Sequence, residues 1–187
     1  AALLTLGVGA AAQVWAPMPL TIAWVAASLA AIGARSALGA RYLRLANPED
    51  QAGLYRVLFV ATEFVAGAAW AGGVALLLNA PEPAAHGFTL VLLMLVAGMI
   101  ATTASAIPAA VGAGIAPIVA ATLWSIGART AMDFAILAAL CGGVLLYFVM
   151  LANRLQKSAL AGFSFQEEKD ALIAELEQSK LNSDEAR

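Results

Sequence analysis

The sequence predicts an all-α integral membrane protein, with six transmembrane helices followed by a cytoplasmic helix that can form a short coiled coil. Hydrophobic residues make up 62% of the 187 residues, charged residues only 12%, and the mean hydropathy is +0.85. This composition leaves too little polar surface to cover a soluble globule, so lipid is the expected solvent. The acidic character of residues 158–187, with three Lys/Arg against seven Asp/Glu, separates them from the membrane domain at 1–157.

Six segments fit the length of a membrane crossing, which takes about 20 apolar residues for a ~30 Å hydrocarbon core. They run from Ala1 to Trp15, Leu20 to Leu38, Val57 to Leu78, Phe88 to Ala106, Ala109 to Ser125 and Phe134 to Leu151. The first is short, and its beginning is expected to be missing. Residues 87–127 carry no charge over 41 positions. As one helix they would measure about 61 Å, so a turn is predicted at Ser105–Pro108.

Basic residues predict the orientation of the spans. Six spans would place only Arg129 on one side and the following residues on the other: Arg35, Arg41, Arg44, Arg56, Arg154 and Lys157. Because cytoplasmic loops are enriched in Lys and Arg, the second side is predicted to be cytoplasmic, together with both termini. The many Ala and Gly residues of the spans predict a bundle with close helix contacts.

Glu63 is the leading candidate for a functional residue. An ionised carboxylate inside a span costs roughly 2.5 kcal/mol or more, so its side chain should face the bundle. At helical spacing it shares a face with Phe59, Gly67 and Trp70, which together could form one wall of a ligand pocket. The functional interpretation is ligand recognition or a protonation-dependent switch. The alternative is a structural hydrogen bond to a residue such as Thr102 or Thr103.

The remaining candidates have ordinary structural explanations beside their functional ones. Trp70 and Trp124 fall toward the outer ends of their spans, where they would form an aromatic belt or clamp a lipophilic ligand. Cys141 is either a small buried residue or a ligand contact. The single histidine, His86, makes a metal site improbable, and no cofactor is expected. Catalytic motifs are absent from the sequence, and the acidic tail argues against nucleic-acid binding.

The segment after Lys157 has the composition of a helix with a weak apolar seam. Phe165, Leu172 and Leu176 are spaced by seven and then four residues, which suits a short parallel coiled coil in a homodimer. Lys169 interrupts that seam, so a single solvated helix is the alternative. A weak seam also suits a signalling helix, because a small free-energy difference then separates alternative registers.

Four segments carry a resemblance to a known group of proteins. They are R-Y-L-R-L-A-N-P at 41–48, E-F-V-A-G-A-A-W at 63–70, the turn between Pro108 and Pro117, and A-L-I-A-E-L-E-Q-S-K-L-N-S-D-E-A-R at 171–187. The chain resembles the membrane-integral sensor regions of bacterial sensor histidine kinases, often hybrid kinases, and of some diguanylate cyclases. The motif that accepts the phosphate in such kinases is absent from this sequence, which leaves the class of output domain open.

The resemblance implies a homodimeric sensor in the bacterial inner membrane that senses a membrane property or a small lipophilic ligand. Arg154, Phe165, Leu172 and Leu176 would relay the signal to a kinase domain, and the kinase would pass a phosphoryl group to a cytoplasmic response regulator. The input domain of a diguanylate cyclase is one alternative. A small transporter or a structural anchor is another.

Overall fold

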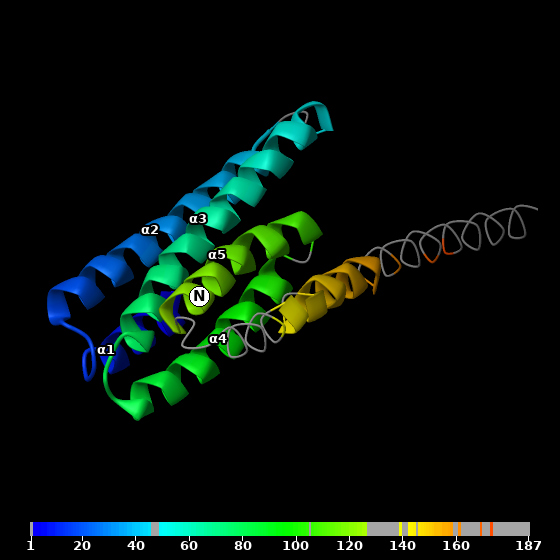
Figure 1. The fold of residues 1–187 in the computed structure, drawn as a ribbon. Coiled ribbons are helices and arrows are strands. Elements are labelled where there is room, and N and C mark those ends of the chain that lie inside the picture. Colours follow the sequence, from blue (N-terminus) through cyan, green and yellow to red (C-terminus); the bar gives the residue numbers. More distant parts are fainter. Residues whose placement is uncertain are drawn as a thin grey trace, which may run out of the picture.

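The computed structural model describes residues 2–45, 49–104, 106–126, 139, 142–144, 146–158, 161, 169 and 173. Every element assigned in these ranges is helical (Figure 1). The elements are α1 (Ala2–Ala12), α2 (Met18–Tyr42), the 3-10 helix η1 (Glu49–Gln51), α3 (Ala52–Leu78), α4 (Pro83–Thr103) and α5 (Pro108–Ile126). The all-α fold predicted from the composition is therefore confirmed.

Four helices, α2 to α5, are long and apolar enough to cross a membrane. The prediction of six spans is not met in the described part of the chain. The first predicted span forms α1, whose 11 residues extend only about 17 Å, roughly half of the hydrocarbon core. Of the sixth predicted span, Phe134 to Leu151, the structure describes residues 139, 142–144 and 146–151, all of them helical, and the others lie outside the described residues.

Two of the candidate spans, α4 and α5, begin at a proline. Pro83 and Pro108 are the first residues of α4 and α5, and the chain turns between Thr103 and Pro108 as predicted. Proline suits the first turn of a helix because the amide that it lacks would have no partner there. At the other boundaries α2 continues to Tyr42 and α3 begins at Ala52, so both helices extend beyond their apolar stretches.

Helix α3 is the centre of the bundle, since it contacts α2, α4 and, over the longest stretch, α5. Gly67 of α3 faces Gly114 of α5 so closely that a Cβ atom on Gly67 would overlap the Gly114 carbonyl group. This backbone approach is typical of membrane helices, which gain dispersion contacts when small residues meet. The Gly67 position is therefore filled by the backbone of α5 and is not an open space.

Three buried threonine hydroxyl groups in the bundle donate to backbone carbonyls close to them in the sequence. Thr89 donates to the Ala85 carbonyl at 2.7 Å, Thr122 to Ile118 at 2.8 Å, and Thr21 to Pro17 at 3.3 Å. Such bonds let polar side chains enter an apolar bundle without losing a partner, since each reaches a carbonyl one turn back.

The two ends of the bundle differ in charge. One end carries the α2–α3 connection and the α4–α5 turn, and Arg41, Arg44 and Arg56 are exposed near it. We call it the basic end. Residues 146–158 are helical and leave the bundle at this end, next to the α4–α5 turn (Figure 1). The predicted boundary at residue 157 falls inside this helix, and most of 158–187 lies outside the described residues.

The contact between Gly67 and Gly114 generates a stability prediction. Gly67→Ala should force α3 and α5 apart and lower the free energy of unfolding by about 1–3 kcal/mol, the usual range for overpacking. The measurement is unfolding of the purified protein in mixed micelles, followed by circular dichroism.

Gly72→Ala is the matched control on the same helix, because a Cβ atom there meets nothing within 4 Å. Alanine favours helix over glycine, so this variant should unfold at the same or a slightly higher denaturant concentration. Equal destabilisation by the two variants would contradict the close packing of α3 and α5.

Candidate functional site: a buried ion pair beside a cavity at the basic end

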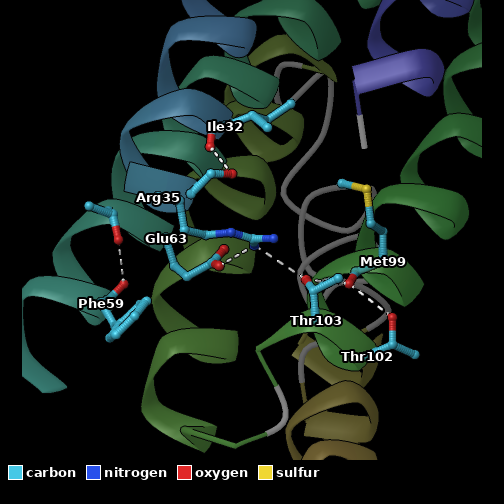
Figure 2. Close-up of polar contacts among 9 residues, drawn as sticks. Ile32, Arg35, Phe59, Glu63, Met99, Thr102 and Thr103 are labelled. Carbon is cyan, nitrogen blue, oxygen red and sulfur yellow. Dashed lines mark hydrogen bonds and ion pairs between the residues drawn. The ribbon is translucent and has the colours of Figure 1, made fainter. Parts of the chain in front are cut away.

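Three helices meet at one ion pair in the bundle. Arg35 of α2 donates through Nη1 to Oε1 of Glu63 on α3 and, at 3.3 Å, to Oγ1 of Thr103, the last residue of α4 (Figure 2). The Thr103 hydroxyl in turn donates to the Met99 carbonyl at 2.8 Å. We call Arg35, Glu63 and Thr103 the polar bridge. It joins α2, α3 and α4 through side chains alone.

The burial of the two charged groups is unequal. The side chain of Glu63 is 4% exposed and that of Arg35 is 27% exposed. A carboxylate without a partner at such a position would be costly, whereas pairing and hydrogen bonding offset much of the desolvation. The long side chain of Arg35 reaches both Glu63 and Thr103 while it stays partly exposed.

Arg35 lies deeper in its helix than the sequence predicts. The sequence predicts Arg35 near the cytoplasmic end of the span Leu20 to Leu38. Because α2 continues to Tyr42, Arg35 lies two turns inside the helix, and its guanidinium group bonds within the bundle. Glu63 faces the bundle as predicted, and Thr103 belongs to its surroundings as the structural alternative supposed. The partner of Glu63 is Arg35, an ionic partner instead of the predicted hydrogen bond alone.

Two indole rings pack between α2 and α3. Trp24 and Trp70 have ring centroids 5.3 Å apart at an interplanar angle of 72°, an edge-to-face arrangement. Trp24 lies directly on Gly73, where any Cβ atom would overlap its ring. Trp70 is 2% exposed, so it is a core residue here and not part of an aromatic belt at the interface.

Helix α2 also carries two buried polar atoms that lack a hydrogen bond within the described part of the chain: Trp24 Nε1 and Ser28 Oγ. They lie one turn apart on the same side of α2, and Arg35 lies two turns further along it. A buried donor without a partner typically costs about 1–3 kcal/mol. Two buried polar groups of α2 could therefore form further hydrogen bonds in another packing of this helix.

A cavity of about 290 Å³ lies at the basic end, near the polar bridge. One side of the cavity is lined by residues of α2 and α3: Tyr42, Tyr55, Arg56 and Phe59. The α4–α5 turn and Gln156 line the rest. The two tyrosine rings stand 5.0 Å apart. Phe59 lies one turn before Glu63, and Thr103 lies three residues before Ala106, so α3 and the α4–α5 turn connect the bridge to the lining of the cavity.

Gln156 ties the helix of residues 146–158 to the bundle. Its side-chain Nε2 donates to the Ala106 carbonyl in the α4–α5 turn at 3.0 Å. Its neighbours Asn153, Arg154 and Lys157 are exposed. The helix that leaves the bundle is thus in direct contact with the turn that follows Thr103.

Other predicted site residues lie elsewhere. Trp124 is 88% exposed on α5, away from the bridge and the cavity, as a residue facing lipid would be. Cys141, Phe165, Leu172 and Leu176 lie outside the described residues. Nε2 of His86 is 3.1 Å from the Leu78 carbonyl and 3.0 Å from that of Ala80, which closes the turn between α3 and α4.

One signal in the sequence could have located the partner of Glu63. Thr21, Trp24, Ser28 and Arg35 are spaced by three, four and seven residues, which places them on one face of a helix. A polar face of this kind in an apolar helix points into the bundle. Among the described residues, no group of three His, Cys, Asp or Glu could hold a metal ion.

The polar bridge predicts unequal effects of its two charges on stability. Arg35→Met should lower the free energy of unfolding by about 3–5 kcal/mol, because it leaves the buried Glu63 carboxylate without its partner. Glu63→Met should cost less, since Arg35 is partly exposed and can turn toward the headgroups. The measurement is again unfolding in mixed micelles.

The double variant Arg35→Met/Glu63→Met should be more stable than Arg35→Met alone, with a coupling of roughly 1–3 kcal/mol. Arg41→Met, an exposed arginine of the same helix, serves as control and should change stability by less than about 0.5 kcal/mol. Additive effects of the two substitutions would show that the ion pair does not couple α2 to α3.

No family model, curated protein or solved structure matches this chain. The resemblance to the sensor regions of histidine kinases therefore stays an expectation from sequence. What the structure establishes is coarser: an all-α, multi-pass membrane protein with four candidate spans and a buried ion pair.

Proposed function

We propose that this chain is the transmembrane input module of a bacterial sensor histidine kinase, in which the polar bridge sets the position of the helix that leaves the membrane. The observation that carries the proposal is the bond between Gln156 and the Ala106 carbonyl. This bond connects the helix of residues 146–158 to the α4–α5 turn. The residue Thr103, just before that turn, is itself hydrogen-bonded to Arg35. A change at the bridge would therefore reach residues 146–158 through the short stretch of backbone from Thr103 to Ala106.

Unpartnered polar atoms on α2 favour a second arrangement of the helices. Trp24 and Ser28 each bury a polar atom without a partner among the described residues, so another position of α2 that satisfies them would regain some free energy. Where two arrangements differ by a few kcal/mol, a ligand needs only a comparable difference in affinity to shift their populations. Helix α2 is thus the element that we expect to move.

The path of the chain supports a further crossing after α5. Ile126 and Pro108 are at opposite ends of α5, about 28 Å apart for its 19 residues. Gln156 contacts Ala106, beside Pro108, so the chain between Ile126 and Gln156 returns to the basic end. We place that end in the cytoplasm of a bacterium, because it carries the exposed arginines of the α2–α3 connection. The cytoplasmic location of the N-terminus stays a prediction.

Two other functions share these features. The input module of a diguanylate cyclase would have the same bundle, and the coding sequence downstream of Arg187 separates the two: a histidine box indicates a kinase and a GGDEF-type segment a cyclase. A small transporter could also use a buried ion pair between helices. Flux of ions or substrates into liposomes that contain the purified chain would support the transporter.

The contact of Gln156 generates a functional prediction. In the full-length protein, reconstituted in liposomes, Gln156→Ala should change the rate of autophosphorylation by about two- to tenfold, since one hydrogen bond contributes roughly 0.5–1.5 kcal/mol to the balance between states. Asn153→Ala is the matched control. It removes an exposed amide from the same helix and should leave the rate unchanged. Equal rates for all three proteins would exclude this route, and no autophosphorylation at all would exclude the kinase.

The proposed homodimer can be tested with cysteines in the predicted coiled coil. After Cys141→Ser, cysteines introduced separately at Phe165 and Leu172 should form symmetric disulfide crosslinks under mild oxidation in membranes, because both positions belong to the apolar seam. A cysteine at Glu167, on the outer side of the same heptad, is the control and should crosslink less. If neither seam position crosslinks, the chain does not dimerise through this helix.

A further inference from the structure

We infer that the cavity at the basic end binds the phosphate headgroup of an anionic phospholipid. This identifies a ligand class for the proposed input module, and its regulatory consequence rests on that function. Binding itself does not, since it depends only on the cavity and its lining. The inference is built from the depth of the cavity in the membrane, its chemistry and the residues that close it.

Helix lengths place the cavity at the level of the headgroups. Helices α4 and α5, with 21 and 19 residues, extend about 31 and 28 Å, which matches a hydrocarbon core of ~30 Å. The turn between them therefore lies at the membrane surface. Helix α3, with 27 residues, extends about 40 Å, so its first two turns project past the core on the same side. Tyr55 and Arg56 lie in those turns and face the cavity.

The lining combines a cation, hydroxyl groups and an apolar floor. Arg56 supplies a guanidinium group, which binds phosphate through paired donors, and Tyr42 and Tyr55 supply phenol groups. None of the described residues that line the cavity is acidic. The buried carboxylate of Glu63, one turn beyond the lining residue Phe59, is paired with Arg35. A phosphate in this cavity would therefore meet donors and no competing negative charge among the lining residues.

The volume and the apolar residues favour a lipid over free phosphate. About 290 Å³ is close to the lower limit of small-molecule sites, which span roughly 300–1,000 Å³, so the cavity can hold a headgroup but not acyl chains. Phe59 and Ile107 add apolar surface that a free phosphate ion would not use. Tyrosine at the interface also suits the boundary between headgroup and acyl chain.

Occupation of the cavity would act on the departing helix directly. Gln156 is part of the cavity wall and donates to Ala106, which is also part of it. A headgroup that fills the cavity must either keep this bond or compete with it. The lipid would thus set the position of residues 146–158 at the same contact through which the polar bridge acts.

The test measures lipid binding to the purified full-length protein without any signalling readout. The protein is stripped of lipid in neutral detergent and titrated separately with short-chain phosphatidylglycerol, short-chain phosphatidylcholine and inorganic phosphate. Bound molecules are counted by native mass spectrometry and affinities are measured by calorimetry. Phosphatidylglycerol should bind at about one site per chain and at least tenfold more tightly than either of the other two.

Arg56→Gln should weaken phosphatidylglycerol binding by about tenfold or more, and this loss should persist in about 0.5 M salt, where charges at the surface are screened beyond roughly 4 Å. Arg44→Gln is the matched control, an exposed arginine at the same end that does not line the cavity. Its effect should be at most about fivefold at low salt and should vanish at high salt. Both arginines are exposed, so both variants are expected to fold, and circular dichroism checks this.

Three results would overturn the inference: equal losses in the two variants at high salt, equal binding of both lipids, or binding of inorganic phosphate as tight as that of phosphatidylglycerol. The last would assign the cavity to a free anion. Failure of the proposed function is distinguishable, because it would show as absent autophosphorylation while binding of phosphatidylglycerol still depended on Arg56.

Discussion

The close approach of α3 and α5 at Gly67 and Gly114 is the constraint on which the rest of the bundle depends. In lipid there is no hydrophobic force to press helices together, so contact between backbones has to supply the attraction. Gly114 also lies near the backbone carbonyl of Glu63, one turn before Gly67. The contact that fixes α3 therefore also fixes the depth and direction of the buried carboxylate. Helix α2 is then held to α3 by the ion pair and by the two indole rings.

The polar bridge gives this apolar bundle a specific arrangement. Most apolar faces of membrane helices can slide against one another with little change in energy, whereas a buried carboxylate has few acceptable positions for its partner. Arg35 satisfies Glu63 and reaches Thr103, so three helices are brought into one register. The unpartnered polar atoms of Trp24 and Ser28 lie on the same helix as Arg35. Helix α2 thus carries both a member of the ion pair and two buried polar atoms without a partner among the described residues.

The basic end brings together the features that are relevant to signalling. The polar bridge, the cavity with Arg56 and the contact of Gln156 all lie around the α4–α5 turn. A short turn between two helices that just span the core has little freedom to move independently of them. A displacement of the turn should therefore accompany a displacement of α4 or α5. This is the physical basis for treating a lipid in the cavity and a change at the bridge as inputs to one output helix.

The sequence by itself determined the solvent, the helical class, the turn before Pro108 and the inward direction of Glu63. Each depends on a local property: apolar length, the missing amide of proline, or the cost of a charge in lipid. Only the tertiary structure decided that Arg35 belongs to the bundle, that Trp70 packs on Trp24, and that the space at Gly67 is filled by Gly114. These are contacts between helices distant in sequence, and they depend on rotations and depths that hydropathy does not specify. The number of spans was misjudged for a related reason, since a count of apolar residues does not tell where a helix in the membrane starts and stops.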